Sequence, residues 1–230
     1  SMTRIPMGGY NFLPHPGLAK DYPEAFVAMG ITAENLARKY QISRAEQQEL
    51  AVLSHDRAAK ARAAGKFTDE IVSITTKAGV IDKDGCIREG TTQDTLNTLK
   101  PAFLEDGTVT AATASPLTDG ASATLVCSED YAKAHGLRIM ARIKSIAVAG
   151  CAPEIMGIGP VAATQKALQR AGLSLKDIDI IELNEAFAAQ SLAVVRDLGI
   201  DLAKMNIDGG AIALGHPLGA TGARITGKAA

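Results

Sequence analysis

The sequence has no tryptophan, few other aromatic residues and almost no net charge. Phe, Trp and Tyr together make up 4% of its 230 residues, and the formal net charge at pH 7 is -1. Proteins that bind single-stranded nucleic acid combine aromatic platforms for the bases with a positive field for the phosphates. This chain has little of either, so we expect no nucleic-acid partner.

Long apolar runs and clustered cysteines are also missing. No run approaches the ~18–20 apolar residues that a membrane-spanning helix requires, so we expect no membrane span. The three cysteines, Cys86, Cys127 and Cys151, lie far apart and form no CxxC pair. This spacing suits a reducing compartment and predicts neither a disulfide framework nor a zinc or other metal site. We expect each of these thiols to be a small, buried or half-buried side chain.

Hydrophobic residues at 47% and charged residues at 21% predict a packed core. Two helices are expected early in the chain, over residues 32–40 and from a capping box at Ser43 and Glu46 to Gly65. Three polar side chains of the second helix are expected to face water: His55, Arg57 and Lys60.

The last third of the sequence alternates between strand and helix patterns, which predicts an α/β layer with parallel strands. The expected strands there cover 141–149 and 178–183, and the expected helices 160–171 and 185–198. Further short strands are predicted at 71–76 and 80–88 around a turn at 82–85, and at 108–112, with an apolar small-residue element at 121–128.

The first candidate site follows the predicted strand at 178–183, where the polar residues Asn184 and Glu185 appear. Ligands of parallel sheets bind beyond the carboxyl ends of the strands, so these side chains are placed where chemistry occurs. The alternative is that Asn184 only caps the helix that follows.

The second candidate is His216, in a glycine-rich stretch that spans 206–224. Glycines there permit unusual backbone angles and close approach of a ligand. Histidine moves protons readily near neutral pH, and Pro217 restrains the backbone beside it. A purely structural histidine is the alternative.

These two stretches, Asn184-Glu185-Ala186-Phe187 and Gly215-His216-Pro217, resemble the active-site motifs of the thiolases. The resemblance extends over essentially the whole chain and implies a layered αβαβα thiolase fold, incomplete because most of the first half-domain is absent. Further segments follow in the order of that family: Met29 to Asn35, Cys86 to Gly90, Pro101 to Phe103, Gly107 to Ala111, Leu117 to Ala121 and Pro153 to Pro160.

The resemblance also implies a division of the chain. Residues 1–107 correspond to the thiolase loop domain, 108–139 to the end of the N-terminal half and 140–230 to an incomplete C-terminal half. The family's nucleophilic cysteine is expected upstream of this sequence and its second cysteine downstream, so the chain is read as truncated at both ends. None of its three cysteines falls at either motif, and without a nucleophile we expect the chain alone to be inactive.

Roles for individual residues follow from the same resemblance. His216 would activate the nucleophilic cysteine, and Asn184 would hold a water that shares in stabilising the oxyanion. Core packing is the alternative for the Phe and Met positions among the remaining assignments. These place Met29 and Ser115 at the pantetheine arm of CoA, Arg88 at its adenine end, and Phe103, Met156 and Phe187 around the acyl pocket.

The function implied is that of a degradative 3-ketoacyl-CoA thiolase, which cleaves 3-ketoacyl-CoA with CoA in β-oxidation. CoA is then a substrate, no cofactor is needed, and a homodimer or homotetramer is expected. The compartment would be the cytoplasm in a bacterium, or mitochondria or peroxisomes in a eukaryote. By the same resemblance, Ala28 stands where acetoacetyl-specific thiolases often have a larger polar residue, which favours longer acyl chains. The alternatives are a biosynthetic acetoacetyl-CoA thiolase and a non-catalytic CoA- or lipid-binding relative.

Overall fold

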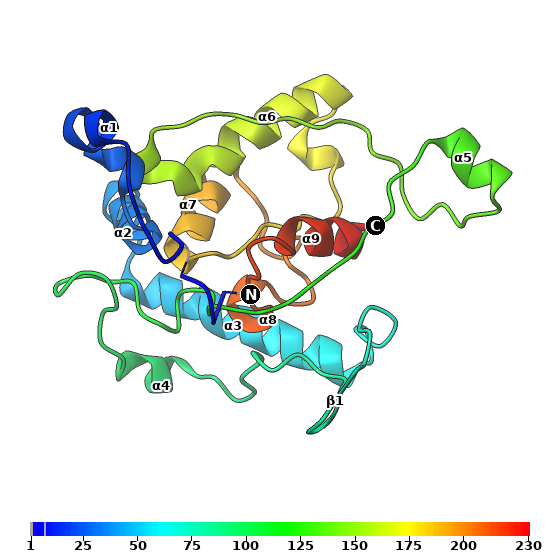
Figure 1. Ribbon diagram of the computed structural model, residues 1–230, viewed down its shortest axis with the longest axis horizontal. Helices are drawn as coiled ribbons and strands as arrows, with labels where there is room; N and C mark the ends of the chain where they lie inside the picture. The colour runs from blue at the N-terminus through cyan, green and yellow to red at the C-terminus, as the bar shows by residue number, and fades with distance from the viewer. Residues whose placement is uncertain (1, 7) are drawn as a thin grey trace.

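A computed structural model describes residues 2–6 and 8–230 of the chain. Helices α2 (Met29–Lys39), α3 (Arg44–Ala63), α7 (Ala188–Leu198) and α8 (Ala211–Leu214) surround the core (Figure 1). The other helices and 3-10 turns are α1 (Pro16–Asp21), η1 (Pro23–Phe26), α4 (Gln93–Asn97), α5 (Glu129–Ala134), η2 (Pro153–Ile158), α6 (Gly159–Ala171), η3 (Leu175–Asp177) and α9 (Thr221–Ala229).

The ends of the long helices follow from local residues, as the sequence predicts. At the start of α3, Ser43 N donates to Glu46 Oε2 at 2.8 Å, and Glu46 N donates to Ser43 Oγ at 3.3 Å. This capping box satisfies two backbone N–H groups that the helix leaves unpaired. Gly172 and Gly199 end α6 and α7 with φ values of 67° and 68°, a left-handed conformation that costs glycine little.

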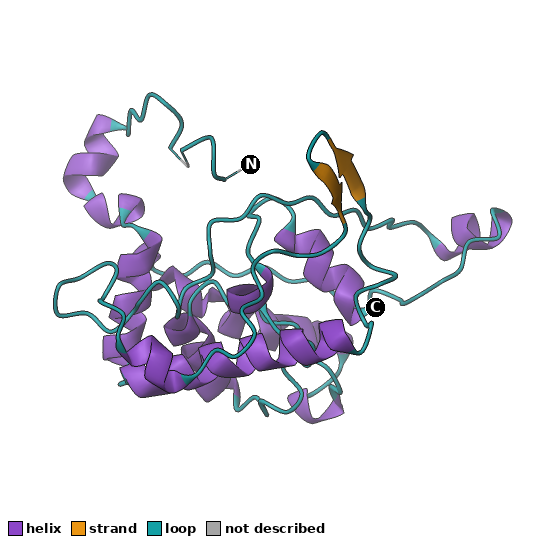
Figure 2. Cartoon of the chain, turned by 90° about the horizontal axis from the view of Figure 1, so that it is seen from below, coloured by secondary structure: helices purple, strands orange, loops and turns teal. Residues whose placement is uncertain are grey.

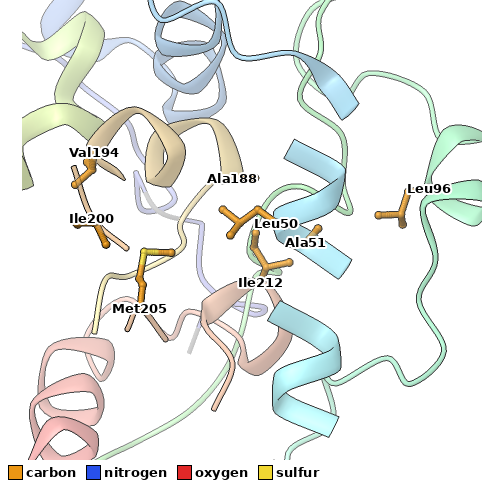
Figure 3. Close-up of a cluster of buried hydrophobic side chains, with 8 residues drawn as sticks. All are labelled: Leu50, Ala51, Leu96, Ala188, Val194, Ile200, Met205 and Ile212. Carbon is orange, nitrogen blue, oxygen red and sulfur yellow. The ribbon is translucent and has the colours of Figure 1, made fainter. Parts of the chain in front are cut away.

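The core joins α3 to the C-terminal third of the chain. Leu50 of α3, Val194 of α7, Ile212 of α8 and the fully buried Met205 belong to one cluster (Figure 3). Burying each such side chain contributes roughly 1.5–3 kcal/mol relative to leaving it exposed. The segment from 181 to 216, which carries both candidate catalytic residues, is thereby packed against α3.

The sheet prediction is wrong in part. Among the described residues the only ladder is the antiparallel pair β1 (Ile74–Thr76) and β2 (Gly79–Ile81), which turns at 77–78 rather than at 82–85 (Figure 2). The predicted strands at 108–112 and 178–183 are reduced to single bridges. These join Pro101 to Thr110 and, in parallel, Ile181 to Met205.

Residues 121–128 and 141–149 form no ladder at all within the described chain. They run beside helices instead: Ser122 Oγ donates to Ala220 O at 2.6 Å, and Ser145 Oγ donates to Ala167 O at 2.7 Å. A strand needs a neighbouring strand to pair its backbone groups, and a helix offers only isolated contacts. The strand prediction at 141–149 is therefore wrong, because this segment has no neighbouring strand among the described residues.

The same segments leave large apolar side chains in solvent. Ile146 is 69% and Val148 is 78% exposed, and α5, which connects these segments, stands away from the body of the molecule in both views (Figures 1 and 2). Contiguous exposure of large apolar side chains is uncommon on the surface of a monomeric protein.

Candidate active site

Asn184 and His216, 32 positions apart in the sequence, meet in the structure. Asn184 Nδ2 lies 3.4 Å from His216 Nε2, and both residues are half-buried. One follows the bridge at Ile181 and the other follows α8. The expectation that the two side chains share one location is confirmed, although a bridge and a short helix bring them there rather than the edge of a sheet.

Asn184 does not cap a helix. The next helix, α7, begins at Ala188 with Phe187 as its N-cap residue, so the capping interpretation of Asn184 is wrong. The side-chain Oδ1 of Asn184 is buried and has no hydrogen-bond partner among the described residues. A buried amide oxygen without a partner costs free energy, which indicates a position for a water or ligand donor.

The hydroxyl of Thr221 sets the tautomer of His216. Thr221 Oγ1 donates to Pro217 O at 3.1 Å, so its oxygen accepts the proton of His216 Nδ1 at 2.7 Å. The Nε2 lone pair then faces Asn184 and is available to take a proton. The sequence analysis missed Thr221, and only its place five residues after the histidine could have suggested it.

The surroundings of His216 favour its neutral form. Burial lowers its pKa, and the nearby Arg224 guanidinium lowers the pKa further. Its backbone is also fixed, because His216 N donates to Thr118 Oγ1 at 3.2 Å. Gly215, at φ 92°, permits this contact, since a Cβ there would lie 2.7 Å from the Thr118 side chain. A fixed neutral imidazole that carries its lone pair on Nε2 can act as a general base.

The segment that carries Asn184 also contains two glutamates, Glu182 and Glu185, whose pKa values are perturbed. Burial raises the pKa of Glu182 to about 7, against the opposing charges of Arg224 and Lys228. Glu185 behaves differently from the expectation that it faces a ligand. Its carboxylate turns inward and is 1% exposed, because hydrogen-bond donors surround it in the core.

Three of the predicted binding residues meet at the segment 186–187, which follows Asn184 in the chain. Ser115 N donates to Ala186 O at 2.9 Å, and the rings of Phe103 and Phe187 meet edge to face with centroids 5.8 Å apart. Phe103 also covers the first turn of α2, which begins at the half-buried Met29. Gly30 is needed there, because a Cβ would lie 2.1 Å from the Phe103 ring.

Met156 and Arg88 are placed outside that group. Met156 is exposed on η2, and the Arg88 side chain is exposed as well. The Arg88 backbone N donates to His55 Nδ1 at 3.1 Å. The prediction that His55 faces solvent is therefore wrong: its side chain is 5% exposed and supports the Arg88 segment. Burial, followed by the charge of Arg88, lowers the pKa of His55.

The described residues add three observations about cysteines, metals and membranes. Cys86 is half-buried, but Cys127 and Cys151 are exposed, which corrects their predicted burial: both lie in the segments without strand neighbours or next to them. Within residues 2–6 and 8–230, no group of three or more His, Cys, Asp or Glu could hold a metal ion. No helix in this part of the chain is long and apolar enough to cross a bilayer.

Comparison with protein families gives two matches that together cover most of the chain. Residues 10–130 match the N-terminal domain of thiolase, and residues 137–230 match its C-terminal domain. The chain is 49% identical to a 3-ketoacyl-CoA thiolase of Bacillus subtilis, over 98% of this chain and 61% of that protein. It is 54% identical to an acetyl-CoA acetyltransferase of Paracoccus denitrificans, over 86% of this chain and 51% of that protein.

Solved structures give the same picture. Human mitochondrial 3-ketoacyl-CoA thiolase in complex with CoA superposes with a TM-score of 0.80 at 48% identity, over 87% of this chain and 51% of that chain. The incomplete thiolase-like αβ fold expected from the sequence is thereby confirmed. The chain spans about half to three fifths of the length of the proteins that it matches.

Proposed function

Because the chain belongs to the thiolase family, we propose that it is part of a 3-ketoacyl-CoA thiolase that supplies the base and oxyanion side of the active site. The protein would cleave 3-ketoacyl-CoA with free CoA into acetyl-CoA and a shortened acyl-CoA. A cysteine attacks the substrate, acetyl-CoA leaves, and the acyl group passes from the cysteine to CoA.

The observation that carries this proposal is the pairing of Asn184 with His216. The Nε2 lone pair of His216, which Asn184 Nδ2 contacts at 3.4 Å, can accept the proton of a thiol. The unpartnered Oδ1 of Asn184 can accept a hydrogen bond from a water beside it. A water held in this way would donate its other proton to the developing oxyanion. The arrangement therefore suits acyl transfer through a thiolate.

The test of the base is His216→Ala in a full-length protein that carries this segment. We expect turnover to fall about a hundredfold or more, the effect of losing a general base. His135→Ala, at an exposed histidine after α5, is the matched control. Turnover of the His216 variant within twofold of the unmodified protein would show that His216 is structural. The 230-residue chain alone is expected to show no thiolysis.

CoA binding is proposed to involve Arg88 at the adenine end and Ser115 at the pantetheine arm. A guanidinium can stack on adenine and pair with phosphate, whereas one hydroxyl contributes about 1 kcal/mol. We therefore expect Arg88→Ala to weaken CoA binding more than Ser115→Ala, with a loss that shrinks as salt rises. Titrations at low and high ionic strength measure this, with the exposed Arg138→Ala as control. Equal affinities with and without Arg88 at low salt would remove it from the site.

Acetoacetyl-CoA formation is the second candidate, favoured by the likeness to an acetyl-CoA acetyltransferase. Comparing turnover on acetoacetyl-CoA and on a long-chain 3-ketoacyl-CoA decides between the two. We further infer that CoA enters only as substrate and that Met29 lies at its pantetheine arm. The acyl pocket would include Phe103, Met156 and Phe187, and the protein would be a homodimer or homotetramer. The division at 107 and 139 and the compartments given above belong to the same proposal.

A further inference from the structure

The buried carboxylate of Glu185 connects three parts of the chain that are distant in sequence. Glu185 Oε2 accepts from Ser54 Oγ of α3 at 2.6 Å and from the backbone N of Ile212 in α8 at 3.2 Å. Glu185 Oε1 accepts from Asn206 Nδ2 at 2.8 Å. We call this carboxylate and its three donors the Glu185 junction.

Each side-chain donor of the junction is itself fixed. Asn206 Nδ2 also donates to Leu183 O at 2.8 Å, and its Oδ1 accepts from Leu183 N at 2.9 Å. Ser54 Oγ accepts from Gly210 N at 3.1 Å. Asn206 therefore binds the backbone of Leu183, next to Asn184, and Ser54 binds the backbone at the start of α8. Closed buried networks hold their members in one arrangement.

Gly210 lets α8 approach the junction. A Cβ at this position would lie 2.0 Å from the carboxyl carbon of Glu185, so no larger residue fits without moving the carboxylate or the helix. The backbone of Gly210 has an ordinary negative φ, so space rather than conformation requires glycine here.

Hydrogen-bond donors surround the carboxyl group of Glu185. Burial is the largest influence on its pKa and raises it, although the hydrogen bonds from Ser54, Asn206 and Ile212 and the charge of Arg224 act in the opposite direction. All three hydrogen bonds need an acceptor, and an ionised carboxylate provides four lone-pair positions and no proton. Its amide analogue would turn an NH₂ group toward at least one of these donors.

The junction is adjacent to both members of the candidate site. Glu185 follows Asn184 directly, and Ile212 is followed by Gly215 and His216 at the end of α8. We propose that Glu185 is a positioning residue: its carboxylate ties the Asn184 segment to α8 and so sets the separation between Asn184 Nδ2 and His216 Nε2. The catalytic role of this positioning rests on the proposed function, whereas the contacts of Glu185 do not depend on it.

The direct test is Glu185→Gln, compared with Glu34→Gln as a matched control. Glu34 is also a buried carboxylate, and it accepts from Thr108 N and Val109 N at 3.0 and 2.8 Å, but it binds no part of the junction. Both variants should lower the melting temperature. Only Glu185→Gln should change the imidazole of His216, measured by ¹⁵N NMR on the 230-residue chain as a function of pH.

In the unmodified chain and in Glu34→Gln we expect a neutral His216 with the proton on Nδ1 and a pKa below its ordinary value. In Glu185→Gln we expect mixed tautomers and a pKa that returns toward about 6.5, because the imidazole loses its fixed surroundings. An unchanged His216 spectrum in folded Glu185→Gln overturns the proposal. If this variant does not fold, Ser54→Ala, which removes one donor, must produce the same change in weaker form; if it leaves the spectrum unchanged, the proposal is wrong.

Kinetics on a full-length protein carrying this segment distinguish the positioning role of Glu185 from the proposed thiolase function. Glu185→Gln should lower kcat at least about tenfold with KM for CoA within about twofold, since a small displacement of catalytic groups costs rate rather than binding. Glu34→Gln should leave kcat unchanged. If no protein shows thiolysis while the NMR effect is present, the proposed function fails and the positioning role stands. Normal kcat in Glu185→Gln contradicts the positioning role alone.

Discussion

Two regions with similar sequence patterns have opposite fates in this structure. Residues 178–183 and residues 141–149 both alternate or accumulate apolar side chains, and both were expected to form strands. The first runs parallel to Met205 and Asn206 and connects to the Glu185 junction. The second lies along α6 and exposes Ile143, Ile146 and Val148. An apolar pattern therefore indicates a tendency to extend, whereas neighbouring residues decide whether the backbone of the segment is paired.

The largest expected effect is a difference in backbone hydrogen exchange between 141–149 and α7, the helix that shares a core cluster with Ile181 and Leu183. Amides of α7, which pack in the core, should exchange about a thousandfold or more slowly than those of 141–149, because local opening costs little where no ladder forms. Exchange followed by mass spectrometry or NMR measures this. Similar exchange rates in the two segments would show that 141–149 is as well protected as α7. The same measurement on a full-length protein shows whether residues beyond these 230 protect 141–149.

The free energy of unfolding should respond differently to the truncation of a side chain in the core and of one in 141–149. Met205 is fully buried and belongs to the main cluster, so Met205→Ala should lower the free energy of unfolding by about 2–5 kcal/mol. Ile146→Ala, which truncates an exposed side chain of 141–149, should change it by less than about 0.5 kcal/mol. Urea denaturation of the two variants gives both numbers. A large loss for Ile146→Ala would show that its segment is packed in solution.

Adding a single methyl group tests the packing at the junction. Gly210→Ala places a Cβ against Glu185, and overpacking of this kind costs about 1–3 kcal/mol. Gly219 has no atom within 4 Å of an added Cβ, so Gly219→Ala serves as the matched control with little effect. Thermal unfolding of both variants is the measurement. Equal melting temperatures would indicate that α8 moves away from the carboxylate without cost.

How much the sequence could predict depends on whether local residues decide the outcome. The capping box at Ser43 and the helix ends at Gly172 and Gly199 are set by residues within one turn, and these predictions are confirmed. The strand predicted at 141–149 depends on a partner elsewhere, and no local pattern reveals whether a partner is present.

The candidate site shows the same limit. Asn184 and His216 could be selected by residue type and motif, and the structure brings them together. The inward turn of Glu185, its bonds to Ser54 and Asn206, and the hydroxyl of Thr221 on His216 Nδ1 join residues through the folded chain. Burial of His55 likewise follows from its contact with the Arg88 backbone, 33 positions away. Such contacts could not be predicted from one sequence.

The smallest expected effect concerns Glu182, whose pKa burial raises to about 7 in the folded chain. Between pH 4.5 and 7 the folded state then binds more protons at this site than the unfolded state, so the free energy of unfolding falls as pH rises through this window. Glu182→Gln removes the ionisation. The variant should match the unmodified chain below about pH 4.5 and exceed its stability above pH 7 by about 1 kcal/mol, after allowance for partial exposure.

Urea denaturation at several pH values measures this difference, with Glu49→Gln on the exposed face of α3 controlling for the loss of a negative charge. Lys228 and Arg224 oppose the burial of Glu182, and Glu185 and Asp208 reinforce it. If the advantage of Glu182→Gln is instead largest at low pH, the two cations dominate and the carboxylate is stabilised in its charged form. Glu182 would then be an ion-pair partner of Arg224 and Lys228 rather than a carboxyl group held neutral by burial.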